Sequence, residues 1–309
     1  MIDLPASDPA KDVVGVLVTY FPDADRLAAR IAAIRKQLGR VVVVDNGSPI
    51  EVIRQIRPNC DDLVECIMLG ENRGIAAAQN IGIDWARSSG ASYVLLLDQD
   101  SDPEPCMVAT LRRAANDMES QGMRPGLLAP VFIDERRSKL ATFFRFDRLR
   151  MRRFGCGAGQ RVVQTDAAIA SGSLISLRAL EKVGGMREDF FIDLVDIEWC
   201  LRARDRGFRL YGVCDAVLGH RLGEKPRSIA GRSVTHHSPL RNYYFFRNAV
   251  WLFRQGYVPA AWKIAVSGQL LRRYLVYPLL FPPRWEYLRM MSLGIWHGAL
   301  GRLGPKKSD

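Results

Sequence analysis

Short runs of β-branched residues alternate with helical segments over the first 100 residues, and this alternation limits the fold more than any other feature. The runs, each expected to be a strand, are residues 13–20, 41–44, 66–69 and 93–97. The helical segments between them are residues 25–38, with apolar side chains at helical spacing, and residues 74–87, with many small side chains. Valine-rich runs without alternation indicate strands buried on both faces. The pattern therefore predicts an α/β fold with a mostly parallel sheet and helices on both faces.

Polar and acidic residues follow the expected strands directly. Asp45 and Asn46 come after the second strand, and Asp98 and Asp100 come after the fourth. Ligands of open parallel sheets bind at the carboxyl ends of the strands, so this part of the chain predicts a Rossmann-like, nucleotide-binding unit. The first strand is not followed by G-x-G-x-x-G, and the chain has no G-x-x-x-x-G-K-[ST]. Dinucleotide dehydrogenases and P-loop enzymes are therefore disfavoured.

The pattern is less regular after residue 130. We expect a strand at residues 171–176, helices at residues 177–183 and 196–206, and a strand at residues 208–213. From residue 239 the chain is rich in aromatic residues and arginine and is expected to be mostly helical. These features divide the chain into residues 1–240, which carry the sheet, and a C-terminal helical segment, residues 241–309.

Three turns carry side chains suited to a metal–nucleotide complex. The carboxylates of Asp98 and Asp100 can approach one Mg²⁺ or Mn²⁺ ion whose other ligands are phosphate oxygens; a solvated acidic turn is the alternative. The Asp45–Ser48 turn can bind a base or ribose edge, or it is a plain Asn-Gly turn. Small residues after Arg73 let a phosphate approach a helix start, or they serve tight helix–sheet packing.

Carboxylates and a histidine in the second half are further candidates. Asp193, Asp196 and Glu198 lie beside a double aromatic, and a carboxyl group near apolar side chains can have a raised pKa and act as a general base. Helix capping by Asp193 or Asp196 is the alternative, and it does not exclude catalysis. His220 follows another expected strand, where a neutral imidazole can complete a metal site; a structural histidine is the alternative.

The net charge of +11 implies a negative partner, such as phosphate, nucleic acid or an anionic membrane. Most of this excess lies in residues 240–309, which hold eleven basic and two acidic residues among many aromatic ones. That mixture suits interfacial helices on an anionic membrane. Helices packed on the catalytic part, or forming a homodimer contact, are the alternative.

The six cysteines, at positions 60, 66, 106, 156, 200 and 214, form no C-x-x-C pair. They are expected to be buried, reduced thiols of an intracellular protein. The N-terminus lacks the pattern of a signal peptide, and no window reaches about 18 uninterrupted apolar residues. We therefore expect a cytoplasmic protein, peripheral on the cytoplasmic face of the inner membrane.

Taken in order, the motifs resemble those of the inverting family 2 glycosyltransferases. They are Thr19-Tyr20 at a strand end, D-N-G-S, N-R-G-x-A-x-A-x-N-x-G, D-Q-D-S and G-G-M-x-E-x-F-F-I-D-x-V-D-x-E-W-C-x-R. The resemblance spans about residues 13–248 and is nearest to the bacterial rhamnosyltransferase branch. It implies a GT-A fold and an enzyme that transfers a sugar in one displacement with inversion.

The resemblance also implies roles for individual residues. Asp196 would be the catalytic base; the Glu-Asp pair of many relatives is Val195-Asp196 here, so the first acid is missing. The residues that would bind the sugar nucleotide are Thr19, Tyr20, Asp45, Asn46, Arg73, Gly74, Asp98, Arg241 and Arg247. Those on the acceptor side would be Gly184, Gly185, Met186, Asp193 and Glu198. The metal ligands would be Asp100 and His220.

By the same resemblance, the donor would be dTDP-L-rhamnose and the cofactor a divalent cation, Mg²⁺ or Mn²⁺. The acceptor would be a saccharide on a polyprenyl diphosphate, in the synthesis of a bacterial O-antigen, capsule or exopolysaccharide. Two other classes stay open. A nucleotidyltransferase should carry a glycine-rich basic loop after the first strand, which residues 15–20 lack. A nucleic-acid-binding protein should carry a recognised motif, and none is found.

Overall fold

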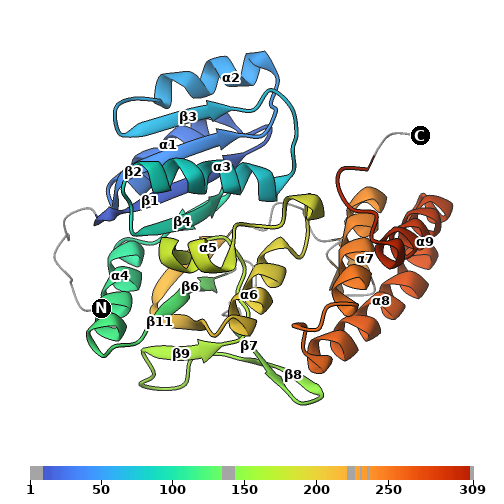
Figure 1. Ribbon diagram of the computed structural model, residues 1–309. Helices are drawn as coiled ribbons and strands as arrows, with labels where there is room; N and C mark the ends of the chain where they lie inside the picture. Colours follow the sequence, from blue (N-terminus) through green and yellow to red (C-terminus); the bar gives the residue numbers. More distant parts are fainter. Residues whose placement is uncertain (1–9, 134–142, 221–226, 230–231, 235–236, 307–309) are drawn as a thin grey trace.

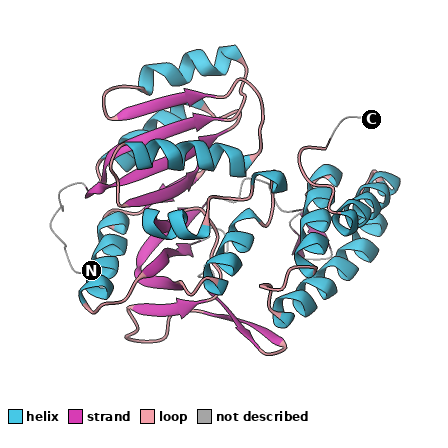
Figure 2. Cartoon of the chain, viewed as in Figure 1, coloured by secondary structure: helices cyan, strands magenta, loops and turns pink. Residues whose placement is uncertain are grey.

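A mixed β-sheet with helices on both sides runs through the part of the chain that the computed structural model describes, residues 10–133, 143–220, 227–229, 232–234 and 237–306 (Figures 1 and 2). The strands are β1 (Ala10–Thr19), β2 (Leu38–Asp45), β3 (Val64–Met68), β4 (Tyr93–Asp98), β5 (Ser101–Pro103), β6 (Pro125–Ile133), β7 (Phe143–Asp147), β8 (Arg150–Phe154), β9 (Val162–Thr165), β10 (Leu174–Ser176), β11 (Arg209–His220), β12 (Arg227–Ile229) and β13 (Arg232–Val234). The helices are α1 (Ala24–Arg35), α2 (Ile50–Ile56), α3 (Ile75–Ser88), α4 (Met107–Ser120), α5 (Leu177–Val183), α6 (Val195–Asp205), α7 (Pro239–Phe253), α8 (Ala260–Leu280) and α9 (Arg284–Leu300), with 3₁₀ turns η1 (Arg57–Asn59) and η2 (Glu188–Phe190).

Within these residues the main sheet has nine strands, in the order β3-β2-β1-β4-β10-β6-β11-β5, with β9 paired to β11. β1 is parallel to β2 and β4, β2 is parallel to β3, and β6 is parallel to β11. β10, β5 and β9 are antiparallel to their neighbours. The expectation of a mostly parallel sheet between helices is confirmed, and the antiparallel strands are additions that the sequence pattern did not predict.

The carboxyl ends of the first strands meet at one edge of the sheet. In the parallel pairing Thr19 lies opposite Asp45, and Val18 lies opposite Asp98. The short β5 then returns antiparallel to the end of β11, so that Ser101 lies opposite His220. Polar residues from distant parts of the chain are thereby brought to one edge.

The core lies on both faces of the sheet because successive residues of a strand point to opposite sides. Val14, Val16 and Val18 of β1 join the cluster that includes α3, α5, α6 and the C-terminal helices. Val13 and Leu17 join the cluster that includes α1 and α4. A strand with apolar residues on both faces needs helices above and below it, which explains the valine-rich runs.

Several expected boundaries are wrong. Helix α1 ends at Arg35, and Leu38, which continues its apolar spacing, begins β2 instead. The strand expected at residues 171–176 is confined to β10, and the strand expected at residues 208–213 continues to His220 in β11. Helices α2 and α4 and strands β5 to β9 were not anticipated, although the buried residues of α4, Met107, Val108, Leu111, Ala114, Ala115 and Met118, follow a helical spacing.

The C-terminal helices lie together beside the sheet (Figure 1). Gly294 and Gly298 of α9 let the backbone of α7 come close: a Cβ atom would lie 2.5 Å from the Tyr243 carbonyl oxygen and 2.4 Å from that of Arg247, respectively. Phe246 of α7 shares a buried cluster with Phe190 and Trp199 from the sheet-bearing part. The alternative in which these helices pack on the rest of the chain therefore holds for α7. None of the helices in the described residues is both long and apolar enough to cross a membrane.

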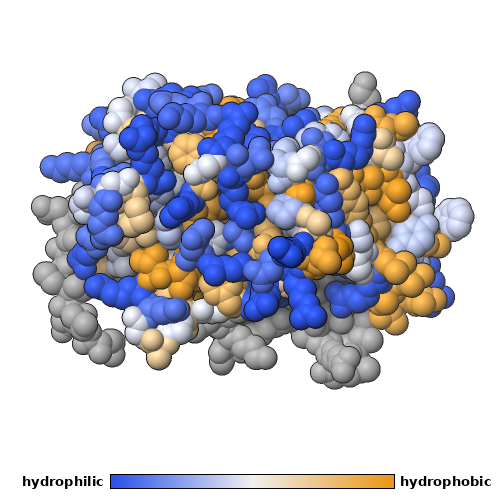
Figure 3. All heavy atoms as spheres, turned by 60° about the horizontal axis from the view of Figure 1, so that its bottom comes forward, coloured by the Kyte–Doolittle hydropathy of each residue, from blue (hydrophilic) through white to orange (hydrophobic). Residues whose placement is uncertain are grey.

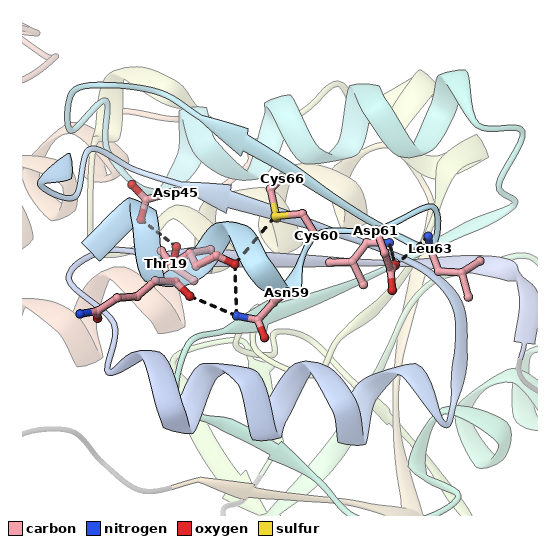
Figure 4. The surroundings of a disulfide bond; sticks show 10 residues. Thr19, Asp45, Asn59, Cys60, Asp61, Leu63 and Cys66 are labelled. Atoms are coloured by element: carbon pink, nitrogen blue, oxygen red, sulfur yellow. Dashed lines mark hydrogen bonds between the residues drawn. A yellow bond between two sulfur atoms is a disulfide. The ribbon is translucent and has the colours of Figure 1, made fainter. Parts of the chain in front are cut away.

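The expectation of six reduced cysteines is wrong. Cys60 is disulfide-bonded to Cys66, and Cys156 to Cys214, with Cα–Cα distances of 5.9 and 5.8 Å. A tight turn, in which Asp61 pairs with Val64, folds Cys60 back onto β3 (Figure 4). Cys106 and Cys200 are free. The chain brings these sulfur atoms together through turns and strand pairing, and the spacing of the cysteines does not reveal such proximity.

Candidate active site

A pocket of about 300 Å³ opens at the carboxyl edge of the sheet, beside the end of β4. Its polar lining residues are Gln79 of α3, Asp98 of β4, Ser171 before β10, Asp193 in the loop before α6, Asp196 of α6 and Arg241 of α7. Leu194 and Ile192 contribute apolar wall. Four of these six polar residues, Asp98, Asp193, Asp196 and Arg241, were singled out from the sequence, and the structure brings them together around one small space.

Asp196 occupies the second residue of α6 and is half-buried. One carboxylate oxygen of Asp196 accepts a hydrogen bond from the backbone N–H of Ile197 at 2.8 Å, and the other accepts one from the backbone N–H of Ala170 at 3.3 Å. Burial raises the pKa of Asp196 above the ordinary 3.8, the negative charge of Asp193 acts in the same direction, and the two backbone donors act against them. A carboxyl group of raised pKa in a pocket can take a proton from a bound hydroxyl.

The loop before Asp196 has an unusual backbone. Phe191, Asp193 and Leu194 have φ values of 64°, 63° and 63°, in a region that costs a non-glycine residue about 1–3 kcal/mol. The N-cap of α6 is Leu194, which makes no side-chain capping bond, so the capping alternative for Asp193 is wrong. Asp193 instead accepts hydrogen bonds from Arg241, with Nε 3.2 Å from both carboxylate oxygens and Nη2 3.1 Å from Oδ1.

The turn that carries Asp98 and Asp100 is held from three sides. The backbone N–H of Asp98 donates to the Ser101 hydroxyl, which lies 2.6 Å from the hydroxyl of Ser171. Gln99 Oε1 accepts from the backbone N–H of Tyr20 at 2.8 Å. Arg30 of α1 donates to the Gln99 carbonyl at 2.6 Å and to Asp102 at 2.8 Å. The two carboxylates are therefore presented by a fixed turn.

The donor set of this turn fits a hard divalent cation. Asp98 and Asp100 are both half-buried and supply carboxylate oxygens two residues apart. The backbone of His220 lies opposite Ser101, next to Asp100. Among the residues that the structure describes, no group of three or more histidine, cysteine or acidic side chains is placed so that it could hold a metal ion. Two carboxylates on one turn suit a hard ion that takes its other ligands from phosphate and water.

The expected nucleoside residues stabilise the turns at this edge. Asp45, fully buried, accepts a hydrogen bond from the hydroxyl of Thr19 at 3.0 Å (Figure 4). It also accepts from the hydroxyl of Ser48 at 2.6 Å and from Ser48 N at 2.8 Å. Asn46, 5% exposed, accepts from Arg73 N at 2.9 Å. Tyr20, 45% exposed, offers its ring to solvent. Among these residues, it is Tyr20 that presents an open surface to a ligand.

Gly74 needs its glycine for two reasons. Its φ is 86°, and a Cβ atom would lie 2.6 Å from the Phe191 carbonyl oxygen. The next backbone N–H, that of Ile75, donates to the same oxygen at 2.8 Å. The start of α3 is therefore packed against the loop before Asp196, and Arg73 beside it pairs with Glu71 at 3.3 Å.

The expected acceptor-side residues Gly184, Gly185 and Met186 lie in a segment that is held by contacts to Arg202 and Asn80. Glu198, fully buried, accepts from Arg202 Nε at 2.8 Å and from the Tyr257 hydroxyl at 2.9 Å, away from the pocket. Arg202 in turn donates to the carbonyl of Gly185 at 2.8 Å, and it lies close to Gly184. The backbone N–H of Met186 donates to Asn80 at 2.7 Å.

Arg247 also lies outside the pocket. Its side chain is fully buried and donates to the carbonyls of Asp189 and Phe190 at 3.0 and 2.9 Å, and to the carbonyl of Gly304. All of these partners are backbone groups of the protein. The structure thus places Arg247 beneath the loop that leads to Asp196.

Sequence reasoning missed Gln79 and Arg30, and the resemblance reached Asn248 without giving it a role of its own. Gln79 is 3% exposed, and its Oε1 makes no hydrogen bond to any described residue, although an unpaired buried amide oxygen costs about 1–3 kcal/mol. It occupies an unspecified position of the N-R-G-x-A-x-A-x-N-x-G motif, so the motif gave no signal for it. The contacts of Arg30 and Asn248 had no local signal either, because their partners lie more than 50 residues away.

The sequence is similar to those of several known proteins. The family model described as Glycosyl transferase family 2 matches residues 16–174. The dTDP-rhamnosyl transferase RfbF of Shigella flexneri is 34% identical over 249 residues, 80% of this chain and 82% of that protein. The low-salt glycan biosynthesis hexosyltransferase Agl10 of Haloferax volcanii is 24% identical over 302 residues, 95% of this chain and 92% of that protein.

Two solved structures have a similar fold. The structure of GalNAc-T7 with UDP, GalNAc and Mn²⁺ superposes with a TM-score of 0.59 at 14% identity, covering 92% of this chain and 54% of that one. The structure of TarS from S. aureus has a TM-score of 0.50 at 15% identity, covering 87% and 44%. At these identities the likeness concerns the fold alone.

Proposed function

The chain belongs to glycosyltransferase family 2 and has a GT-A type fold, and from this premise we propose that it transfers L-rhamnose from dTDP-L-rhamnose to a hydroxyl of a saccharide acceptor, with inversion. The choice of donor is supported by the 34% identity to a relative named as a dTDP-rhamnosyl transferase. The observation that carries the mechanism is the pocket in which Asp98, Asp196 and Arg241 line one small space. At about 300 Å³ it suits one sugar ring.

Asp196 is the base of this reaction. Its carboxylate takes the proton of the acceptor hydroxyl while that oxygen attacks the anomeric carbon from the face opposite the leaving diphosphate. One bond forms as the other breaks, so that the product carries the inverted configuration and no covalent enzyme intermediate is needed. The raised pKa of Asp196 supports this assignment, because a more basic carboxylate accepts a proton more readily.

Asp98 and Asp100 are the residues that would hold a divalent cation, Mg²⁺ or Mn²⁺, with His220 as a third ligand. Such a cation neutralises the charge that develops on the departing diphosphate. The protein's own contribution is the turn that Arg30 and Ser101 fix, since a fixed turn needs little reorganisation when the nucleotide binds. Arg241, opposite in charge to the diphosphate, lies at the pocket wall.

The nucleoside lies against Tyr20, beyond the end of β1. Thr19, Asp45 and Asn46 hold the turns on either side of it, and Arg73 and Gly74 lie near the ribose and the diphosphate. Gly184, Gly185 and Met186 border the acceptor, and the links to Asn80 and Arg202 keep that segment in place.

The acceptor is a saccharide carried by a polyprenyl diphosphate, and the enzyme binds the cytoplasmic face of the inner membrane while building a cell-surface polysaccharide. Support comes from the exposed side of α8 and α9, where Figure 3 shows apolar side chains gathered on the C-terminal part. Large side chains exposed on these two helices are Leu271, Leu275, Leu279, Trp285 and Trp296, between 56% and 76% exposed. Glu286 is the single acidic residue of α8 and α9, against five lysine and arginine residues. An apolar face with a positive surround matches an anionic lipid surface.

A panel of sugar nucleotides tests the function. The purified protein is incubated with each donor and Mg²⁺ or Mn²⁺, with a bacterial lipid extract as acceptor source, and the released nucleotide is identified. We expect dTDP from dTDP-L-rhamnose, at a rate well above that from dTDP-glucose or UDP-sugars. Pyrophosphate as the product would instead identify a nucleotidyltransferase, and a preference for another donor would replace rhamnose.

A further inference from the structure

The loop between η2 and α6 adopts a conformation that its own residues disfavour. Phe191, Asp193 and Leu194 all have positive φ values without being glycine. Such a backbone persists only where the surrounding structure holds it, and it is typical of functional sites. Asp193 lies in this loop, Asp196 lies two residues after it, and both line the pocket. The contacts that hold the loop therefore also set the positions of both carboxylates.

Helix α7 holds the loop through one amide group. Asn248 Nδ2 lies 3.1 Å from the carbonyl oxygen of Phe190, 2.9 Å from that of Ile192 and 2.9 Å from that of Asp193. Its two hydrogens are therefore shared among three acceptors. The Asn248 side chain is fully buried, so water does not replace these bonds when the amide is removed.

Neighbouring groups complete the arrangement. Arg247 Nε donates to Asn248 Oδ1 at 3.0 Å, which orients the amide so that its N–H₂ group faces the loop. From the opposite side the N–H of Ile75 donates to the Phe191 carbonyl. The carbonyls of residues 190 to 193 thus all accept hydrogen bonds, and three of the four accept them from Asn248.

We propose that Asn248 is a positioning residue, oriented by Arg247, which holds the loop of residues 191–194 so that Asp196 faces the acceptor hydroxyl; the catalytic part of this inference rests on the function proposed above. Asn248 does not touch the pocket itself. Without its amide the loop relaxes toward negative φ values, and the carboxylates of Asp193 and Asp196 move from their places. The nucleoside edge at Thr19 and Asp45 is on other elements and is unaffected.

The test compares Asn248→Leu with Asn242→Leu. Asn242 lies on the same helix, is equally buried, and donates to the carbonyls of His237 and Ser238, which are outside the loop. Both substitutions remove a buried amide of the same size. Three quantities are measured on the full-length protein: the rate of dTDP release from saturating dTDP-L-rhamnose, the Kd for dTDP, and hydrogen exchange of the peptide covering residues 188–196.

In Asn248→Leu we expect the amide hydrogens of that peptide to exchange at least tenfold faster than in wild type. We also expect dTDP release to be at least tenfold slower, with the Kd for dTDP within twofold of wild type. Asn242→Leu should change neither the exchange nor the rate by more than twofold. If Asn248→Leu does not fold, Asn248→Ser, which keeps one donor, should show both effects at smaller size. Equal effects in the two variants, or unchanged exchange with Asn248→Leu, overturns the inference.

The role of Asn248 in holding the loop and its effect on catalysis through Asp196 can be tested separately. Hydrogen exchange needs no substrate, so it decides the role of Asn248 in holding the loop even if wild type releases no dTDP, a result that would count against the proposed function. Faster exchange together with unchanged dTDP release would overturn the positioning of Asp196.

Discussion

Arg30 and Asp102 form an ion pair, with Nε 2.8 Å from Oδ1, that ties helix α1 to the far end of the turn carrying Asp98 and Asp100. The same guanidinium donates to the Gln99 carbonyl in the middle of that turn. The Arg30 side chain is only 14% exposed. Arg30 therefore holds the turn at two points, one on each side of Asp100.

Arg30→Ala is expected to raise the Mn²⁺ concentration needed for half-maximal dTDP release about threefold to tenfold, because each lost hydrogen bond is worth about 0.5–1.5 kcal/mol. Arg26→Ala is the matched control, since Arg26 is on the same helix but 67% exposed and pairs with Asp23 at 3.6 Å. Metal titration of activity in the two variants measures the effect. An equal, small shift in both would show that Arg30 does not fix the turn.

The raised pKa of Asp196 predicts the acid side of the pH–rate profile. The base must be ionised, so kcat/KM falls as the pH decreases through the pKa of the folded state, which lies above the ordinary 3.8. In wild type we expect this loss of activity at a pH higher than an ordinary aspartate would give. A profile that stays flat down to about pH 4 would contradict the assignment.

The same shift has a consequence for stability. A carboxyl whose folded pKa is raised favours the folded state when protonated, and this contribution is lost as the pH rises from 3.8 through the folded pKa. At pH 8 wild type carries the full cost of the ionised group. Asp196→Asn should therefore melt at the same or a higher temperature at pH 8, measured by calorimetry. A clearly lower Tm would mean that the charge stabilises the fold.

The two disulfides differ in the length of chain they close. Cys156 and Cys214 are 58 residues apart, whereas Cys60 and Cys66 are 6 apart. A longer closed loop restricts the unfolded chain more, so Cys156→Ser should cost about 4 kcal/mol and Cys60→Ser about 2 kcal/mol. Urea unfolding of the oxidised proteins gives both values. No loss with Cys156→Ser would indicate that this bond is absent in solution.

The apolar face of α8 predicts lipid binding. In a flotation assay, wild type should bind vesicles that contain anionic phospholipid. The double variant Leu275→Asp/Leu279→Asp should bind them at least tenfold more weakly, because each leucine contributes about 1.5–3 kcal/mol on burial. Leu63→Asp, at a leucine 47% exposed in the turn before β3, is the control. Unchanged flotation of the double variant would remove α8 from the interface. A dimer that this variant converts to a monomer would instead identify a second copy of the chain as the occupant.

Much of the sheet follows from local patterns. The valine runs of β1 and β2 and the apolar run of β4 predict strands, and their polar ends predict a shared edge, because parallel strands place like ends together. Asp98, Asp193, Asp196 and Arg241 were named from motifs and line one pocket. These four residues meet in one pocket only because of the fold, and the order of the motifs along the chain was enough to predict that fold.

Buried polar residues were harder to interpret. Arg247 and Glu198 carry charges and lie near motif residues, which suggests substrate contact, yet both are fully buried against partners within the protein. Whether a charge faces a ligand or a carbonyl depends on chain segments that meet only after folding. For the same reason the spacing of the cysteines did not reveal the disulfides, and the contacts of Asn248 could not be predicted from the sequence.

The turnover of Asp196→Asn with dTDP-L-rhamnose tests the central claim most directly. Loss of a general base typically costs 10²–10⁴-fold, and we predict a fall of about that size in the rate of dTDP release, with the Kd for dTDP unchanged. Asparagine is similar in size to aspartate and cannot accept the proton. Near-native turnover by a folded Asp196→Asn would contradict the assignment of Asp196 as the base.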